Sequence, residues 1–228
     1  MVTLRDDSVV RVLNRLHESA KADNIKLLKL LPRILLGKLS GKTFFEIINP
    51  KDVKDIYMPL DKEQGRLAYQ TARAIGAKNI VEFGTSFGIS AIYLAAAVKD
   101  NGEGKVIGTE IEPGKYRKSI DNISEAGLSD FIDVRLGDAL ETLKEMDQPV
   151  DMVLLDGWKN LYLPVLELLK PKLRVGSVVL GDNIYTFKTE LKPYVEYMQS
   201  GKNGFESTTL PMKDGFEYSV YLGSQKAV

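Results

Sequence analysis

Residues 81–90 of this chain read Val81-Glu82-Phe83-Gly84-Thr85-Ser86-Phe87-Gly88-Ile89-Ser90. This order is typical of a buried strand that runs through a tight glycine turn into a helix. Gly84 and Gly88 let the backbone turn sharply and approach a ligand closely. The acidic Glu82 before the turn disfavours a phosphate at the start of the helix and favours a cationic ligand. A plain structural turn between strand and helix is the alternative.

The following sequence continues this alternation. Apolar runs predict strands at Asn79–Phe83, Val106–Glu110, Ile132–Arg135, Val150–Leu155 and Ser177–Gly181, with helices between them at Ser90–Val98, Lys115–Ala126, Ala139–Met146 and Leu161–Leu169. Strands separated by helices of this length indicate a parallel sheet. After a last helix near Lys188–Met198, Asp214-Gly215 lies between Phe205–Leu210 and Glu217–Leu222, which predicts a hairpin. We therefore expect an α/β fold: a Rossmann-like, doubly wound, mostly parallel seven-stranded sheet with an antiparallel C-terminal hairpin strand and an N-terminal helical extension.

Composition excludes several kinds of site and partner. The chain has 228 residues, with 31 Lys and Arg balancing 31 Asp and Glu, one histidine (His17) and no cysteine. The absence of cysteine rules out disulfides, thiolate nucleophiles and Cys-based zinc sites, and a single histidine argues against Ser-His-Asp catalysis. The balanced charge gives no reason to expect a nucleic-acid partner. No apolar stretch follows Met1–Asp7 that is long enough for a signal or a membrane span, so we expect a cytoplasmic protein.

The N-terminal segment contains two amphipathic patterns. Apolar residues between Val9 and Leu16 predict a first helix, and Ile25–Leu39 is leucine-rich, interleaved with lysine and arginine, and broken by Pro32 and Gly37. A basic apolar stretch of this kind lies on a membrane surface in some proteins. More often it packs on its own domain or on a twin subunit, and we expect packing on protein here.

Acidic residues at the ends of the next two predicted strands suggest contacts to a nucleoside. Glu110 stands 28 residues after Glu82, where an acid accepts hydrogen bonds from both ribose hydroxyls in dinucleotide dehydrogenases and adenosylmethionine enzymes alike. Glu112 is a nearby competitor beyond the strand end. Asp138 either reaches an adenine edge or caps the helix that follows.

A polar constellation follows the later strands: Asp156-Gly157-Trp158-Lys159, Asp182-Asn183 and Glu217. Two carboxylates and an amide oxygen at neighbouring strand ends suit Mg²⁺. Lys159 lies one turn after Asp156, where it would serve as a base. Helix caps, a solvated lysine and an exposed strand residue are the alternatives for these positions. Trp158, the only tryptophan, more plausibly walls a ligand pocket than fills the core.

These motifs together resemble the class I S-adenosylmethionine-dependent O-methyltransferases, and most of all the metal-dependent catechol O-methyltransferase branch. The resemblance covers roughly Met58 to Leu222, so we divide the chain into a helical extension (1–57) and a methyltransferase domain (58–228). It implies the catalytic residues Lys159 and Glu217, with Glu217 holding the second substrate hydroxyl, and the metal ligands Asp156, Asp182 and Asn183. It implies cofactor contacts from Met58, Leu60, Glu82, Gly84, Ser86, Ser90, Glu110, Ile111, Asp138, Ala139, Asp156 and Trp158.

The chain departs from this family in a few places. Gly157 stands where the animal enzymes have a histidine beside the cofactor, and Ile56 stands near an aromatic gatekeeper position. These differences bear on substrate shape rather than on the reaction. The resemblance implies Mg²⁺-dependent methyl transfer from S-adenosylmethionine to a hydroxyl of a catechol-type phenolic small molecule. It also allows for a homodimer. A non-catalytic adenosylmethionine-binding or scaffold protein and a dinucleotide-dependent oxidoreductase are the rival hypotheses.

Overall fold

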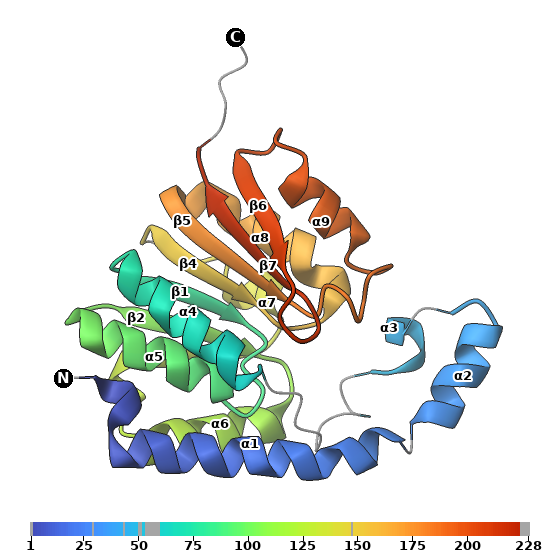
Figure 1. The fold of residues 1–228 in the computed structure, drawn as a ribbon, viewed down its shortest axis with the longest axis horizontal. Coiled ribbons are helices and arrows are strands. Elements are labelled where there is room, and N and C mark those ends of the chain that lie inside the picture. The colour runs from blue at the N-terminus through green and yellow to red at the C-terminus, as the bar shows by residue number, and fades with distance from the viewer. Residues whose placement is uncertain are drawn as a thin grey trace.

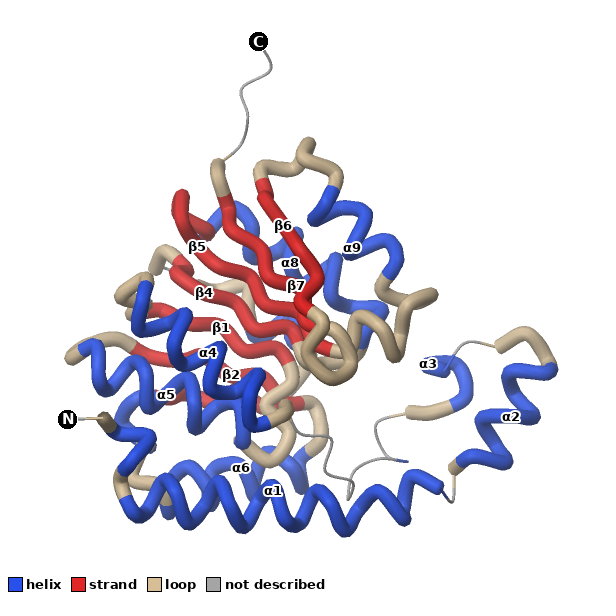
Figure 2. Tube along the Cα trace, in the orientation of Figure 1, coloured by secondary structure: helices blue, strands red, loops and turns tan. Residues whose placement is uncertain are grey.

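The computed structural model describes residues 2–28, 30–42, 44–49, 52, 60–146 and 148–223. Within these ranges, the centre is a seven-stranded sheet in the order β3-β2-β1-β4-β5-β7-β6 (Figures 1 and 2). The strands are β1 (Asn79–Phe83), β2 (Lys105–Glu110), β3 (Ile132–Leu136), β4 (Val150–Leu155), β5 (Leu173–Asp182), β6 (Phe205–Leu210) and β7 (Phe216–Tyr221). Strands β1 to β5 are parallel, and β7 runs antiparallel to both β5 and β6. The order changes direction between β1 and β4, where open sheets of this kind form a ligand crevice.

Helices cover both faces of the sheet (Figure 1). On one side lie α4 (Lys62–Ala74), α5 (Ile89–Asn101) and α6 (Pro113–Glu125), with α1 (Asp7–Leu28) packed outside α5 and α6. On the other side lie α7 (Ala139–Thr142), α8 (Tyr162–Leu169) and α9 (Lys192–Gln199). The remaining elements are α2 (Leu31–Leu39), α3 (Phe44–Ile47) and the 3₁₀ turns η1 (Thr3–Arg5), η3 (Ser129–Phe131), η4 (Lys159–Leu161) and η5 (Lys170–Lys172).

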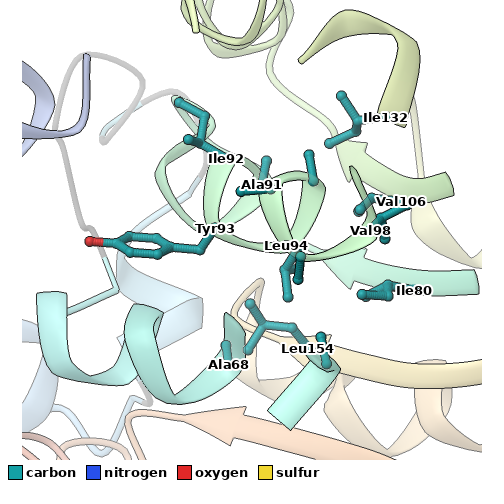
Figure 3. Close-up of a cluster of buried hydrophobic side chains, with 14 of the residues drawn as sticks. Ala68, Ile80, Ala91, Ile92, Tyr93, Leu94, Val98, Val106, Ile132 and Leu154 are labelled. Atoms are coloured by element: carbon teal, nitrogen blue, oxygen red, sulfur yellow. The ribbon is translucent and has the colours of Figure 1, made fainter. Parts of the chain in front are cut away.

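The larger core is built around α5, which is buried on all sides from Ile89 to Val98. Its apolar side chains contact Ile80, Val106 and Leu154 on three neighbouring strands (Figure 3). A helix that is hydrophobic all round must be enclosed in this way. The helix α4 crosses it closely because position 65 is a glycine: a Cβ there would lie 2.6 Å from the ring of Tyr93.

The predicted fold class is confirmed, and β1, β4 and β6 have the predicted bounds. Strand β5 begins at Leu173, earlier than predicted, because the pairing with β4 shifts between Val150 and Met152. Gly176, at φ 84°, takes up the extra residues in a bulge. The last helix begins at Lys192 rather than Lys188, since Pro193 has no backbone N–H to donate inside a helix but is tolerated in the first turn. The helix predicted at Ala139–Met146 ends at Thr142.

The N-terminal segment packs largely on the rest of the chain. Four apolar residues of α1 (Val9, Val12, Leu13 and Leu16) belong to the same core as α5. Leu30 and Ile34 pack with α3 and with Trp158, whereas Leu35, Leu36 and Leu39 on α2 are exposed. Of the helices in the described ranges, none is long and apolar enough to cross a membrane.

Candidate functional site

A pocket opens at the carboxyl ends of β1, β2, β4 and β5, with about 1000 Å³ of empty space including its mouth. Parallel strands deliver their last residues to this edge. Most of the predicted site residues line the pocket together. They are Gly84, Ser86, Glu110, Ile111, Asp138, Ala139, Asp156, Trp158, Lys159 and Asn183.

The glycine turn forms the floor of the pocket through a close backbone approach. Gly84 has φ 98°, and a Cβ on it would lie 2.6 Å from the Cα of Gly157. A Cβ on Gly157 would in turn lie 2.6 Å from the ring of Phe83. The absence of a side chain at position 157, which sequence comparison marks as a departure, is therefore a packing requirement of this chain.

Glu110 is held in a fixed orientation at the end of β2. Its Oε2 accepts a hydrogen bond from the backbone N–H of Ser86 (2.7 Å), and its Oε1 accepts one from the N–H of Glu112 (2.8 Å). The competitor Glu112 also lines the pocket, but its carboxylate caps α6 by accepting a hydrogen bond from the N–H of Lys115 at 2.7 Å. Asp138 lines the pocket but also caps α7 through the N–H of Leu140 (2.9 Å), so its adenine contact stays a prediction.

Glu82 is fully buried and does not line the pocket. Its Oε2 accepts a hydrogen bond from the hydroxyl of Thr85 at 2.7 Å, while its Oε1 has no partner within the described ranges. Burial raises the pKa of Glu82, and the nearby hydroxyls of Ser90 and Thr85 oppose this rise. Buried polar atoms are nearly always paired, and the hydroxyl of Ser90 is a donor close to this carboxylate.

Asp156 and Asp182 form a buried carboxylate pair at the ends of β4 and β5. Burial raises the pKa of Asp182 to about 7, and the negative charge of Asp156 adds to the rise. Burial also raises the pKa of Asp156, while the ammonium group of Lys159 opposes the change. Asp182 does not itself line the pocket, whereas Asn183, the next residue, does line it and has a left-handed backbone at φ 67°.

The chemistry of this donor set fits a divalent cation. Two buried like charges with an amide beside them are hard oxygen donors, and a dication would neutralise their repulsion. Among the residues that the structure describes, no group of three or more His, Cys, Asp or Glu side chains is placed to hold a metal ion. A metal site on Asp156, Asp182 and Asn183 would therefore use two carboxylates and the side-chain amide oxygen of Asn183 as its protein ligands.

Lys159 lies almost fully buried between the carboxylate of Asp156 and an aromatic layer made of Phe83, Tyr162 and Tyr194. Its Nζ is 3.1 Å from Asp156 Oδ1 and donates to the hydroxyl of Tyr162 at 2.8 Å. The hydroxyl of Tyr162 in turn donates to the backbone carbonyl of Asp182 at 3.2 Å. Sequence reasoning missed Tyr162. The signal that could have found Tyr162 is its position three residues after Lys159, which places both side chains on the same side of a helical turn.

Two further residues around the site were also missed. The Nε2 of Gln64 donates to Asp182 Oδ1 at 2.7 Å, and Gln64 is held there by the capping box that it forms with Asp61. That spacing of Asp and Gln is visible in the sequence. Phe44 of α3 lines the pocket and packs edge-on against Phe187 with 5.2 Å between ring centroids. The N-terminal extension thus contributes a wall of the pocket.

The structure does not bring Glu217 to this pocket. Glu217 pairs with Gly181 on β5, so its side chain points to the sheet face opposite that of Asp182. There it accepts hydrogen bonds from Gln199 (2.8 Å), Ser207 (2.5 Å) and Thr209. The expectation that Glu217 faces the metal ligands across a substrate-wide gap is corrected, because these contacts are those of a buried structural carboxylate.

The remaining predicted cofactor residues lie apart from the pocket or outside the described ranges. Met58 lies outside the described residues, as does Ile56. Leu60 is buried and lines a second, neighbouring cavity with Gln64. Ser90 is buried in the first turn of α5, beside Glu82.

Comparison with known proteins shows that this chain is similar to methyltransferases. Residues 81–184 match the family described as a methyltransferase domain. A catechol O-methyltransferase from Niastella koreensis is 29% identical over 170 residues, which span 72% of this chain and 70% of that protein. A caffeoyl-CoA O-methyltransferase from Eucalyptus globulus is 29% identical over 131 residues, spanning 55% of this chain and about half (52%) of the plant protein. The crystal structure of an O-methyltransferase from Bacillus cereus in complex with SAH superposes with a TM-score of 0.66 at 26% identity, covering 72% of this chain and 82% of the other.

Proposed function

We propose that this chain, which belongs to the class I S-adenosylmethionine-dependent O-methyltransferases of the catechol O-methyltransferase type, methylates one hydroxyl of a vicinal diphenol with the help of Mg²⁺. The observation that carries the proposal is the position of Lys159. Its amine lies inside the pocket, between a carboxylate of the strand-end pair and a fixed tyrosine hydroxyl. This is a base placed beside a site of cation-binding chemistry, at the edge of the sheet where a nucleoside is expected.

The methyl donor would be held along the carboxyl ends of β1, β2 and β4. Glu110 uses one lone pair of each carboxylate oxygen on a backbone N–H, and its remaining lone pairs would accept hydrogen bonds from the two ribose hydroxyls. Ile111 and Ala139 supply apolar contacts, and Trp158 walls the pocket.

Asp156, Asp182 and Asn183 would hold the metal ion. When bound, Mg²⁺ lowers the pKa of a coordinated hydroxyl and fixes its orientation. Gln64 would orient the Asp182 carboxylate. Its Nε2 donates a 2.7 Å hydrogen bond to Oδ1, which leaves Oδ2 of Asp182 for the ion.

Lys159 would remove the proton of the acceptor hydroxyl. In its neutral form, the amine has two N–H bonds and one lone pair. Asp156 Oδ1 and the Tyr162 hydroxyl take the two N–H bonds, which leaves the lone pair for the acceptor. The proton passes to Nζ, the phenolate oxygen bonds to the methyl carbon, and the carbon–sulfur bond breaks to give S-adenosylhomocysteine. Positioning of this kind supplies roughly 7–11 kcal/mol of the barrier reduction in favourable cases.

The decisive experiment is a methylation assay with a panel of vicinal diphenols and mass-spectrometric detection, run with Mg²⁺ and with excess chelator. We expect a monomethylated product only when Mg²⁺ is present. Adenosylmethionine binding without any product would favour the non-catalytic or scaffold hypothesis. Oxidation of the acceptor with a dinucleotide would favour the oxidoreductase, although the turn Gly84-x-x-x-Gly88 lacks the spacing typical of such enzymes.

A further inference from the structure

The helix α2 carries the densest group of exposed apolar side chains in the described part of the chain. Of the twelve large apolar residues that are exposed there, four lie on its nine residues: Leu31, Leu35, Leu36 and Leu39, which are 44%, 61%, 67% and 85% exposed. The first, second and last of these recur every fourth residue and form a stripe along one side of the helix, with Leu36 next to it. Scattered apolar residues are normal on a protein surface, whereas a contiguous apolar patch marks an interaction site.

The opposite side of α2 packs on protein. Leu30 and Ile34 contact α3, and a Cβ at Gly37 would lie 2.4 Å from the Cδ1 of Ile47, so the two helices approach closely. In Figure 1, α2 lies at the edge of the molecule, with α3 on its inner side. The packing on protein expected for this segment therefore accounts for the inner side of α2 and leaves the leucine face exposed.

The leucine face lies in a basic stretch of the sequence. Residues 29–42 contain Lys29, Arg33, Lys38 and Lys42, and no aspartate or glutamate. Arg33 is paired with Asp52, its Nη1 lying 2.9 Å from the carboxylate, so the three lysines give the stretch its excess of positive charge. The chain as a whole has no net charge, which makes this excess a local feature of the segment around α2.

An apolar helix face among positive charges fits a lipid surface with anionic head groups. The leucines would enter the boundary between the head groups and the acyl chains, while the lysines stay at the level of the lipid phosphates. A second copy of the chain fits less well, because a two-fold contact through α2 brings the same basic residues together. Like charges placed opposite one another oppose association.

We propose that α2 is a docking surface for an anionic membrane surface, which it binds through its four exposed leucines and through the lysines among and beside them in the sequence. This inference goes beyond the proposed methyl transfer and does not depend on it. Since α3 packs on the inner side of α2 and supplies Phe44 to the pocket, the docked protein has one wall of its pocket close to the lipid. A helix of nine residues buries little apolar area, so we expect reversible binding that weakens as salt is raised.

The test is co-sedimentation of the full chain with vesicles made of equal parts of phosphatidylcholine and phosphatidylglycerol, compared with vesicles of phosphatidylcholine alone. We expect binding to the mixed vesicles at low salt, and binding at least about tenfold weaker to the neutral ones. Combined substitution of Leu35→Gln, Leu36→Gln and Leu39→Gln should weaken binding to the mixed vesicles by at least about tenfold. Val175→Gln with Leu222→Gln alters exposed apolar residues outside α2 and is the matched control, which should bind as the unaltered protein does.

The contribution of positive charge is tested separately. Lys38→Gln with Lys42→Gln should weaken binding to the mixed vesicles by about tenfold or more, the combined effect of two charges near an anionic surface. Lys105→Gln with Lys202→Gln removes two exposed lysines from other parts of the chain and should leave binding unchanged. Circular dichroism of each variant, matching that of the unaltered protein, shows that a loss of binding does not come from unfolding.

No binding to the mixed vesicles, or equal binding to both kinds, would overturn the inference. So would losses in the control variants as large as those in the α2 variants. If the unaltered protein does not bind vesicles and the leucine variant turns a dimer into a monomer in analytical ultracentrifugation, the leucine face is a contact between copies and the inference is wrong. Methylation of diphenols is measured independently, so the failure of either proposal leaves the other in place.

Discussion

The hydroxyl of Tyr162 lies 2.8 Å from the Nζ of Lys159 and joins it to the end of β5 through a hydrogen bond to the carbonyl of Asp182. Because that single hydroxyl proton is donated to the carbonyl, Tyr162 meets Lys159 as an acceptor. The ring is fully buried and packs edge-on against Tyr194 with 5.5 Å between centroids, so the hydroxyl has little freedom to move. The position of the base is thereby tied to the strand end that carries Asp182 and Asn183.

We predict that Tyr162→Phe lowers kcat by about 10- to 100-fold at saturating donor and Mg²⁺, because Lys159 loses one of its two fixed partners. Affinity for adenosylmethionine, measured by calorimetry, should not change. Tyr194→Phe is the matched control. Tyr194 belongs to the same aromatic layer, but its hydroxyl makes no hydrogen bond within the described ranges, so its removal should leave kcat intact.

If Tyr162→Phe needs more Mg²⁺ for half-maximal activity but reaches the original kcat once Mg²⁺ is saturating, Tyr162 acts only on the strand end that carries Asp182. A loss of kcat shared equally by Tyr194→Phe would point to general disruption of the aromatic layer.

Lys159→Met should abolish most turnover while retaining the methyl donor. Methionine has a similar length but cannot accept the proton, so we expect kcat to fall by roughly 10²–10⁴, the usual scale for a positioned general base. Calorimetry should show unchanged donor affinity, because Lys159 contacts Asp156 and Tyr162 rather than the ribose end of the pocket. Turnover near that of the unaltered protein would mean that ionisation of the acceptor needs no base.

Glu110→Ala should weaken adenosylmethionine binding by about 1–3 kcal/mol, the cost of leaving hydrogen-bond donors unpaired. Glu112→Ala offers a close comparison, since that carboxylate caps α6. Its loss should lower the free energy of unfolding by about 1 kcal/mol without changing donor affinity. If instead Glu112→Ala weakens binding and Glu110→Ala does not, the ribose contact belongs to Glu112.

The sheet and most of the pocket could be predicted from the sequence because both follow from local patterns. Apolar runs mark the parallel strands, and polar residues directly after them must meet at one edge of the sheet. This reasoning brought Glu110, Asp156, Lys159 and Asn183 to one pocket, as the structure shows. The bulge at Gly176 escaped prediction because it depends on how β4 and β5 pair, which no local pattern specifies.

The errors at the site also come from contacts between segments that are distant in the sequence. Glu217 was placed at the pocket because the family resemblance implies that it holds a substrate hydroxyl, but its pairing with Gly181 puts it on the other face. A shift of one residue in strand pairing reverses the face that every side chain occupies, so sequence alone could not decide the question. Phe44 was missed because its contact with Phe187 joins segments far apart in the chain.

Stability should depend on the protonation of His17. Burial and the charge of Lys62 lower its pKa from 6.5 to about 4, so between these values the unfolded chain binds more protons than the folded one. Stability is then fully present above pH 6.5 and is lost as the pH falls towards 4. We predict that the free energy of unfolding drops by about 2 kcal/mol more between pH 7 and pH 5 in the unaltered protein than in His17→Gln. Equal pH dependence of the two proteins in urea titrations would contradict the assignment.

Removal of divalent metal should abolish methyl transfer to a diphenol, and added Mg²⁺ should restore it. The physical reason is the buried pair of Asp156 and Asp182: burial, and then the negative charge of Asp156, raise the pKa of Asp182, as expected where two carboxylates share a buried site. A dication relieves that repulsion, and Gln64 keeps the carboxylate of Asp182 oriented for it. Asp182→Asn should therefore raise the Mg²⁺ concentration needed for half-maximal activity by at least about tenfold. Asp133→Asn, which removes an exposed carboxylate on β3, should leave it unchanged and controls for surface charge. Full activity in excess chelator, with the protein shown to be metal-free by elemental analysis, would rule out a metal at these strand ends and leave Lys159 as the sole means of activating the acceptor.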